Sequence, residues 1–164
     1  MRRIQVGVLA LGAVVALTAL AGCGSSNTHG EEGTLKLIEP GGNAGSFGEI
    51  GHASQKGVSP GNGIAFSTPL ENAEKKTVGE LNALCIATAT SPGESIHGTC
   101  SGTAEVPGGS FALNVGGKSI GNDITGAIVG GTGKYEGALG TFTSKATESG
   151  GNSPEELTFH YILP

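Results

Sequence analysis

Short alternating segments, separated by glycine-rich turns, constrain the fold of this chain most strongly. Glycine makes up 31 of its 164 residues. No segment keeps the i, i+3, i+4, i+7 apolar spacing long enough to predict an amphipathic helix. Turn residues such as Pro-Gly-Gly-Asn at 40–43 separate segments with strand character. The expected strands are residues 34–39, 46–50, 63–67, 80–90, 96–106, 110–115, 124–129, 138–147 and 156–163.

Several of these segments alternate cleanly between apolar and polar residues. In the last one, Leu157, Phe159 and Tyr161 share one face, while Thr158 and His160 share the other. Side chains of a strand alternate faces with a period of two, so each apolar set marks a core or cavity wall. Eight or so such strands favour a closed antiparallel barrel or a sandwich. The sequence therefore predicts an all-β domain with little helix, at most one turn within residues 70–76.

The N-terminus has the layout of an export signal. Arg2 and Arg3 precede an uncharged apolar run that ends in Leu-Ala-Gly-Cys at residues 20–23. This ending resembles the lipobox of bacterial lipoproteins, which implies that residues 1–22 form a signal peptide and that the thiol of Cys23 carries lipid. The acyl chains would anchor the protein to the cell membrane on its extracytoplasmic face. The alternative is an uncleaved transmembrane helix, for which the run is short.

Cleavage before Cys23 would leave an acidic chain without arginine. The full sequence has 9 basic and 14 acidic residues, and the only arginines are Arg2 and Arg3. Such a chain lacks the basic surface that nucleic acid requires, so nucleic acid is excluded as a partner. Residues 23–33 are small and polar, as in a flexible tether, and include His29. Residues 34–164 are expected to form one β-barrel domain.

The two remaining cysteines fit a disulfide. Cys85 and Cys100 lie on adjacent expected strands, and a symmetric four-residue loop at 91–94 would place them directly opposite each other. At a non-hydrogen-bonded position the Cα atoms would be about 4.5 Å apart, which a disulfide can span. A disulfide that closes a loop of about 15 residues would stabilise the folded state by roughly 3 kcal/mol. The alternatives are a metal site or a catalytic thiol; with few partner cysteines and scattered histidines, we expect no metal.

A glycine-rich segment near residue 130 resembles a known family. Gly-Gly-Thr-Gly-Lys-Tyr at 130–135 departs from a phosphate-binding loop, because no helix follows. Together with Gly-Ala-Leu-Gly-Thr at 137–141, the segment at 63–79 and the cysteine hairpin, it resembles the dirigent proteins and allene oxide cyclases. The resemblance implies an eight-stranded antiparallel barrel with a small apolar cavity, no cofactor, and a homotrimer. Leu139 stands where the family often has arginine, so a site that relies on a cavity arginine is not expected.

The same resemblance suggests site residues. Those families act by shaping a pocket with a few acidic or polar groups. Glu49 shares a strand face with Phe47, and a carboxyl beside apolar neighbours can act as a general acid. The alternative for Glu49 is a solvated loop residue. Phe47 and Tyr161 are the candidates for ligand contact, and Tyr161 can equally be a core residue.

Three functions are compatible with these observations. The first is a lipid-anchored barrel that binds a small apolar ligand or serves as an interaction module. The second is a cofactor-free isomerase or cyclase of the allene oxide cyclase or dirigent type. The third is a structural surface lipoprotein whose barrel is packed solid. The sequence shows no Ser-His-Asp set, no metal cluster and no convincing pair of acids, so the first interpretation is favoured.

Overall fold

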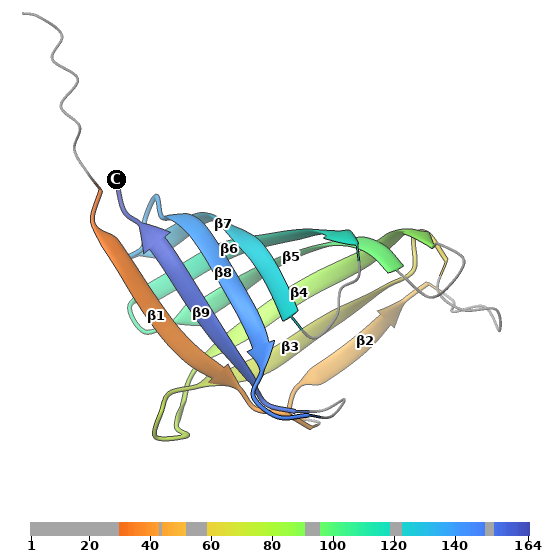
Figure 1. Ribbon diagram of the computed structural model, residues 1–164, viewed down its shortest axis with the longest axis horizontal. Helices are drawn as coiled ribbons and strands as arrows, with labels where there is room; N and C mark the ends of the chain where they lie inside the picture. The colour runs from red at the N-terminus through yellow and green to blue at the C-terminus, as the bar shows by residue number, and fades with distance from the viewer. Residues whose placement is uncertain (1–29, 43, 52–58, 91–95, 119–122, 150–152) are drawn as a thin grey trace, which may run out of the picture.

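A computed structural model describes residues 30–42, 44–51, 59–90, 96–118, 123–149 and 153–164. Within these residues the chain forms strands and turns, without a helix (Figure 1). No helix long and apolar enough to span a bilayer occurs there. The strands are β1 (Glu32–Glu39), β2 (Ser46–Ile50), β3 (Gly63–Glu71), β4 (Thr77–Thr90), β5 (Ile96–Val106), β6 (Gly109–Lys118), β7 (Asp123–Gly133), β8 (Leu139–Ala146) and β9 (Glu155–Ile162).

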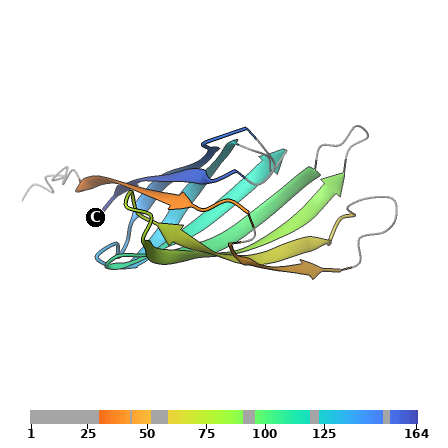
Figure 2. The same cartoon turned by 90° about the horizontal axis from the view of Figure 1, so that it is seen from below.

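Eight of the described strands close into an antiparallel barrel. The sheet runs in the order β1-β9-β8-β7-β6-β5-β4-β3-β2, and β1 also pairs with β3 through Ile38 and Glu71. β2 is a ninth strand that pairs along the remaining edge of β3 and diverges from the barrel (Figures 1 and 2). Closure removes the free edges that an open sheet would expose. The predicted all-β, eight-stranded antiparallel barrel is confirmed.

The strand boundaries differ from the expected ones by a few residues, and the difference at β1 bears on the tether. β1 begins at Glu32, so the ordered sheet includes two residues of the segment that we expected to be tether. The turn expected near residues 70–76 contains no helix; the Asn72 side chain there accepts hydrogen bonds from the backbone N–H groups of Glu74 and Lys76. Residues 1–22, Cys23 and His29 lie outside the described residues.

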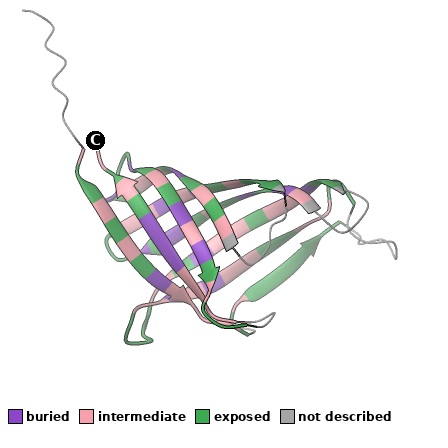
Figure 3. Ribbon diagram, viewed as in Figure 1, coloured by how far each residue is buried: buried purple, intermediate pink, exposed green. Residues whose placement is uncertain are grey.

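One half of the barrel is filled by aromatic side chains. Phe111, Tyr135 and Phe159 are at most 1% exposed. The ring centroid of Phe111 lies 4.2 Å from that of Tyr135 and 5.2 Å from that of Phe159. Tyr135 lies in the β7–β8 turn. The turn folds closely over Gly131 of β7, and only glycine fits there because a Cβ would collide with the Tyr135 backbone oxygen. Tyr135 therefore closes this end, which we call the plugged end. Figure 3 shows buried stretches on β8 and β9, whereas β2 is exposed throughout.

The predicted disulfide is confirmed. Cys85 and Cys100 are direct register partners on β4 and β5, are bonded, and have a Cα–Cα distance of 4.0 Å. A bulge between Ala87 and Ala89 shifts the pairing nearer the hairpin loop. Thr90 consequently pairs with Ile96 rather than with the expected Ser95.

Candidate functional site: an apolar cavity with a carboxylate pair

The other half of the barrel encloses a cavity of about 440 Å³. Its wall is formed mostly by inward-facing residues from β1 to β9, and most of its exposed lining residues lie on or next to β2 and at the start of β3. We call this half the hollow end, and its exposed rim the mouth. Apolar residues dominate the wall, among them Phe66, Leu81, Leu113 and Leu157. The cavity can therefore accept a small apolar molecule.

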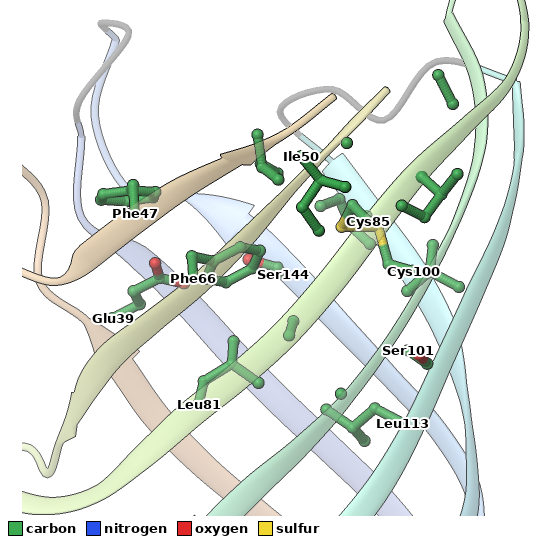
Figure 4. Close-up of a pocket in the computed structure, with 18 of the residues that line it drawn as sticks. Glu39, Phe47, Ile50, Phe66, Leu81, Cys85, Cys100, Ser101, Leu113 and Ser144 are labelled. Carbon is green, nitrogen blue, oxygen red and sulfur yellow. A yellow bond between two sulfur atoms is a disulfide. The ribbon is translucent and has the colours of Figure 1, made fainter. Parts of the chain in front are cut away.

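The Cys85–Cys100 disulfide forms part of the cavity wall. Both residues point to the inner face, and Figure 4 shows the sulfur atoms between β4 and β5, on the side toward Ile50. Phe66 of β3 and Leu81 of β4 continue the same wall. The disulfide thus joins two wall strands at a place where the interior is empty instead of packed.

Two glutamates meet at the inner side of the cavity. Glu39 at the end of β1 is the direct register partner of Glu155 at the start of β9, and both line the cavity. The Ser144 hydroxyl donates a hydrogen bond to Glu155, and Ser144 is buried. We call Glu39 and Glu155 the carboxylate pair.

The surroundings of Glu39 favour its neutral form. Burial raises the pKa of the Glu39 carboxyl to about 7, and the negative charge of Glu155 acts in the same direction. A hydrogen bond with the Thr68 side chain opposes the rise. Near neutral pH, therefore, Glu39 is in part a carboxylic acid that can donate a proton or a hydrogen bond within an apolar cavity.

Our sequence interpretation, which found no convincing acid pair, was wrong on this point. The two glutamates lie at opposite ends of the domain sequence, and only the β1–β9 pairing brings them together. A signal was present in the alternation: Glu39 continues the inward face of Leu37, and Glu155 that of Leu157. Glu39 and Glu155 thus show the same sequence signal as Glu49, a carboxylate on a strand face that carries apolar residues.

The structure places two of the predicted site residues at the cavity and one elsewhere. Phe47 and Glu49 line the mouth from β2; Phe47 is 63% exposed, and its ring centroid is 6.0 Å from that of Phe66. Glu49 is exposed and pairs with Ile64 in the β2–β3 register. Tyr161 instead packs at the plugged end, with its ring centroid 5.3 Å from those of Phe111 and Tyr135. The roles of all three remain predictions.

Among the described residues, no group of three His, Cys, Asp or Glu side chains is arranged to hold a metal ion. Leu139, at the position where the resembling families often carry arginine, is 60% exposed. It is not among the residues that line the cavity. The acidic residues among the described cavity lining are Glu39, Glu49 and Glu155.

Several solved structures share this barrel fold. No family model and no curated protein matches the sequence. A pyocyanin demethylase superposes with a TM-score of 0.62 at 22% identity, over 76% of this chain and 97% of that one. A pterocarpan synthase dirigent protein superposes with a TM-score of 0.62 at 16% identity, over 83% of this chain and 87% of that one. A Diels-Alderase from Streptomyces koyangensis superposes with a TM-score of 0.60 at 13% identity, over 81% of this chain and 64% of that one.

The barrel is dirigent-like. At these identities the likeness shows the fold, and it agrees with the eight-stranded arrangement that the sequence resemblance implied.

Proposed function

We propose that this protein is a lipid-anchored, extracytoplasmic barrel that binds a small apolar molecule in the cavity of its hollow end. The observation that carries the proposal is the cavity itself, whose volume of about 440 Å³ falls within the usual range of small-molecule sites. The anchor is supported by the Leu-Ala-Gly-Cys sequence at residues 20–23, and the membrane is the expected partner through lipid on Cys23.

The residues that line the cavity argue against a barrel that serves only as a packed scaffold. Ala83 and Ala87 occupy inward positions of the wall, where larger side chains would fill the space. Empty apolar space lowers stability, since its lining loses packing contacts. A bound ligand would restore those packing contacts. Small wall residues are therefore better explained by a ligand-binding barrel than by a packed scaffold.

Native mass spectrometry of the protein from its own cell envelope tests ligand binding. We expect a reproducible extra mass that is released on denaturation. The matched control is Ala83→Phe, which would place a ring in the cavity and should abolish the extra mass while the barrel remains folded. A wild-type protein that carries no extra mass, and to which no small apolar compound binds, would contradict the proposal.

Metabolic labelling with an alkyne fatty acid tests the anchor separately. We expect the wild-type chain to incorporate the label and Cys23→Ser to lose it. Retention of the label in Cys23→Ser would show that Cys23 is not the site of lipidation.

The carboxylate pair favours a second function, a cofactor-free cyclase or isomerase. Glu39 could protonate a bound substrate, since its pKa of about 7 suits a general acid at neutral pH. Structural neighbours named as a dirigent protein and a Diels-Alderase support this second function by fold only. Glu49 at the mouth is the other acid candidate. Turnover of the released ligand that is lost in Glu39→Gln but kept in Glu49→Gln would assign the acid to Glu39; the opposite pattern would assign it to Glu49.

A further inference from the structure

Among the side chains that the structure describes, none that carries a positive charge pairs with Glu39 or Glu155. Among the described residues, Lys36 pairs with Glu156, its Nζ lying 2.9 Å from Oε1, on the outer face of the barrel. Burial, Glu155 and Thr68 account for the shifted pKa of Glu39, and no lysine contributes to it. No arginine follows Arg3 in the sequence. The negative charge at the inner side of the cavity is therefore left uncompensated by the described side chains.

An uncompensated pair of this kind is costly. Two carboxylates in a partly buried, apolar setting repel each other and lose hydration, so one of them tends to hold a proton. Ser144 and Thr68 supply one hydroxyl to each carboxylate, which leaves further oxygen lone pairs able to accept hydrogen bonds. A bound cation could replace the proton and relieve the repulsion, and an N–H donor would at the same time satisfy the free lone pairs.

We propose that the cavity selects ligands that carry a protonated nitrogen at one end of an apolar body, with Glu39 and Glu155 accepting hydrogen bonds from that nitrogen. The apolar body lies against Phe66, Leu81 and the disulfide. This inference rests on the proposed ligand-binding function and names the chemical class of its ligand.

The inference has a direct consequence for pH dependence. In the described part of the chain, the groups that face the carboxylate pair are the hydroxyls of Thr68 on β3 and Ser144 on β8, and Glu49 lines the mouth from β2. The ammonium group competes with the proton on Glu39, so its binding strengthens as the pH rises through 7. A neutral ligand of the same shape lacks this competition.

A matched pair of probes tests the proposal: 1-naphthylmethylammonium and the neutral 1-naphthalenemethanol. The full-length lipid-anchored protein is placed in nanodiscs of uncharged lipid, with empty nanodiscs as the blank, and binding is measured by ligand-observed NMR at pH 6 and pH 8. We expect the ammonium probe to bind at least about 10-fold more tightly than the alcohol at pH 8, as for a charge-assisted hydrogen bond. The ratio should shrink at pH 6, where Glu39 is mostly protonated.

Substitution of either acid locates the effect. Glu39→Gln and Glu155→Gln should each weaken binding of the ammonium probe about 10- to 100-fold and leave the alcohol nearly unchanged. The control is Glu105→Gln, which removes an exposed charge of β5 outside the cavity. Retained binding of the alcohol shows that each variant is folded.

The outcomes separate this inference from the proposed function. Equal affinity for both probes, or a preference that the two glutamine variants leave unchanged, would overturn the inference and leave apolar ligand binding in place. Failure of both probes to bind the wild-type cavity would overturn the inference and count against ligand binding as well. Tighter binding of the alcohol at low pH would indicate a neutral hydrogen-bond acceptor as the ligand.

Discussion

The two ends of the barrel share most of their strands and differ in the side chains that their inner faces carry. At the plugged end, Phe111 and Phe159 are fully buried and Tyr135 closes the end from its turn. At the hollow end, small inward residues such as Ala83 leave a cavity, and Phe47 at the mouth is 63% exposed. Regular strand alternation is common to both ends. Side-chain size therefore decides which part of the barrel is core and which part is a site.

The largest expected contrast between the ends is in stability. Phe111→Ala should lower the free energy of unfolding by about 3–5 kcal/mol, because a fully buried ring is replaced by a cavity. Phe47→Ala should cost less than about 1 kcal/mol, since most of its ring already contacts solvent. Urea unfolding of both variants measures the difference. Equal losses would mean that the hollow end is packed as tightly as the plugged end.

The disulfide is expected to compensate for missing packing at the hollow end. Replacing both Cys85 and Cys100 with alanine should lower the unfolding free energy by about 2–4 kcal/mol, since the open chain gains entropy when unfolded. Urea unfolding without reductant measures this loss, and wild type in dithiothreitol should match the variant. If reductant leaves the unfolding free energy of wild type unchanged, the disulfide does not stabilise the hollow end.

The smallest expected effect depends on pH and again belongs to the hollow end. The folded-state pKa of Glu39 is raised from 4.5 to about 7. A raised carboxyl pKa contributes stability below pH 4.5, and that stability is lost as the pH rises through 7. Glu39→Gln removes this pH dependence. The change in unfolding free energy that it causes should therefore be about 1–3 kcal/mol more favourable at pH 8 than at pH 4.5, a range that allows for the partial exposure of Glu39.

Thermal unfolding of wild type and Glu39→Gln between pH 4.5 and 8 gives this difference. Glu105→Gln, on an exposed position of β5, is the control and should show no such trend. A Glu39→Gln variant that is equally destabilised at every pH would show that Glu39 is held as an ion and not as an acid.

Local patterns account for the parts of the fold that could be predicted. Alternation located the strands, and the short spacing between Cys85 and Cys100 fixed their pairing even though a bulge altered the register nearer the loop. Contacts between residues that are far apart in the sequence were harder to predict. The carboxylate pair joins the first and last strands, and no local pattern reports that contact.

Alternation also gives the face of a residue without its position along the barrel axis. Phe47 and Tyr161 were both candidates for ligand contact, and the structure separates them: Phe47 lies at the mouth and Tyr161 in the plugged end. The difference arises from strand stagger and from the turn that carries Tyr135, neither of which is encoded in the spacing of a single strand.

The point at which β1 enters the barrel has a consequence for how ligands would arrive. β1 begins at the plugged end, where the backbone N–H of Leu163 donates to the Glu31 carbonyl oxygen at 2.9 Å and the C-terminus lies nearby (Figure 1). If Cys23 carries lipid, the tether would attach the barrel at its plugged end, and the mouth would lie at the end farther from the attachment point. Its cargo would then come from the aqueous phase rather than by lateral diffusion out of the lipid, which favours molecules soluble enough to make that journey.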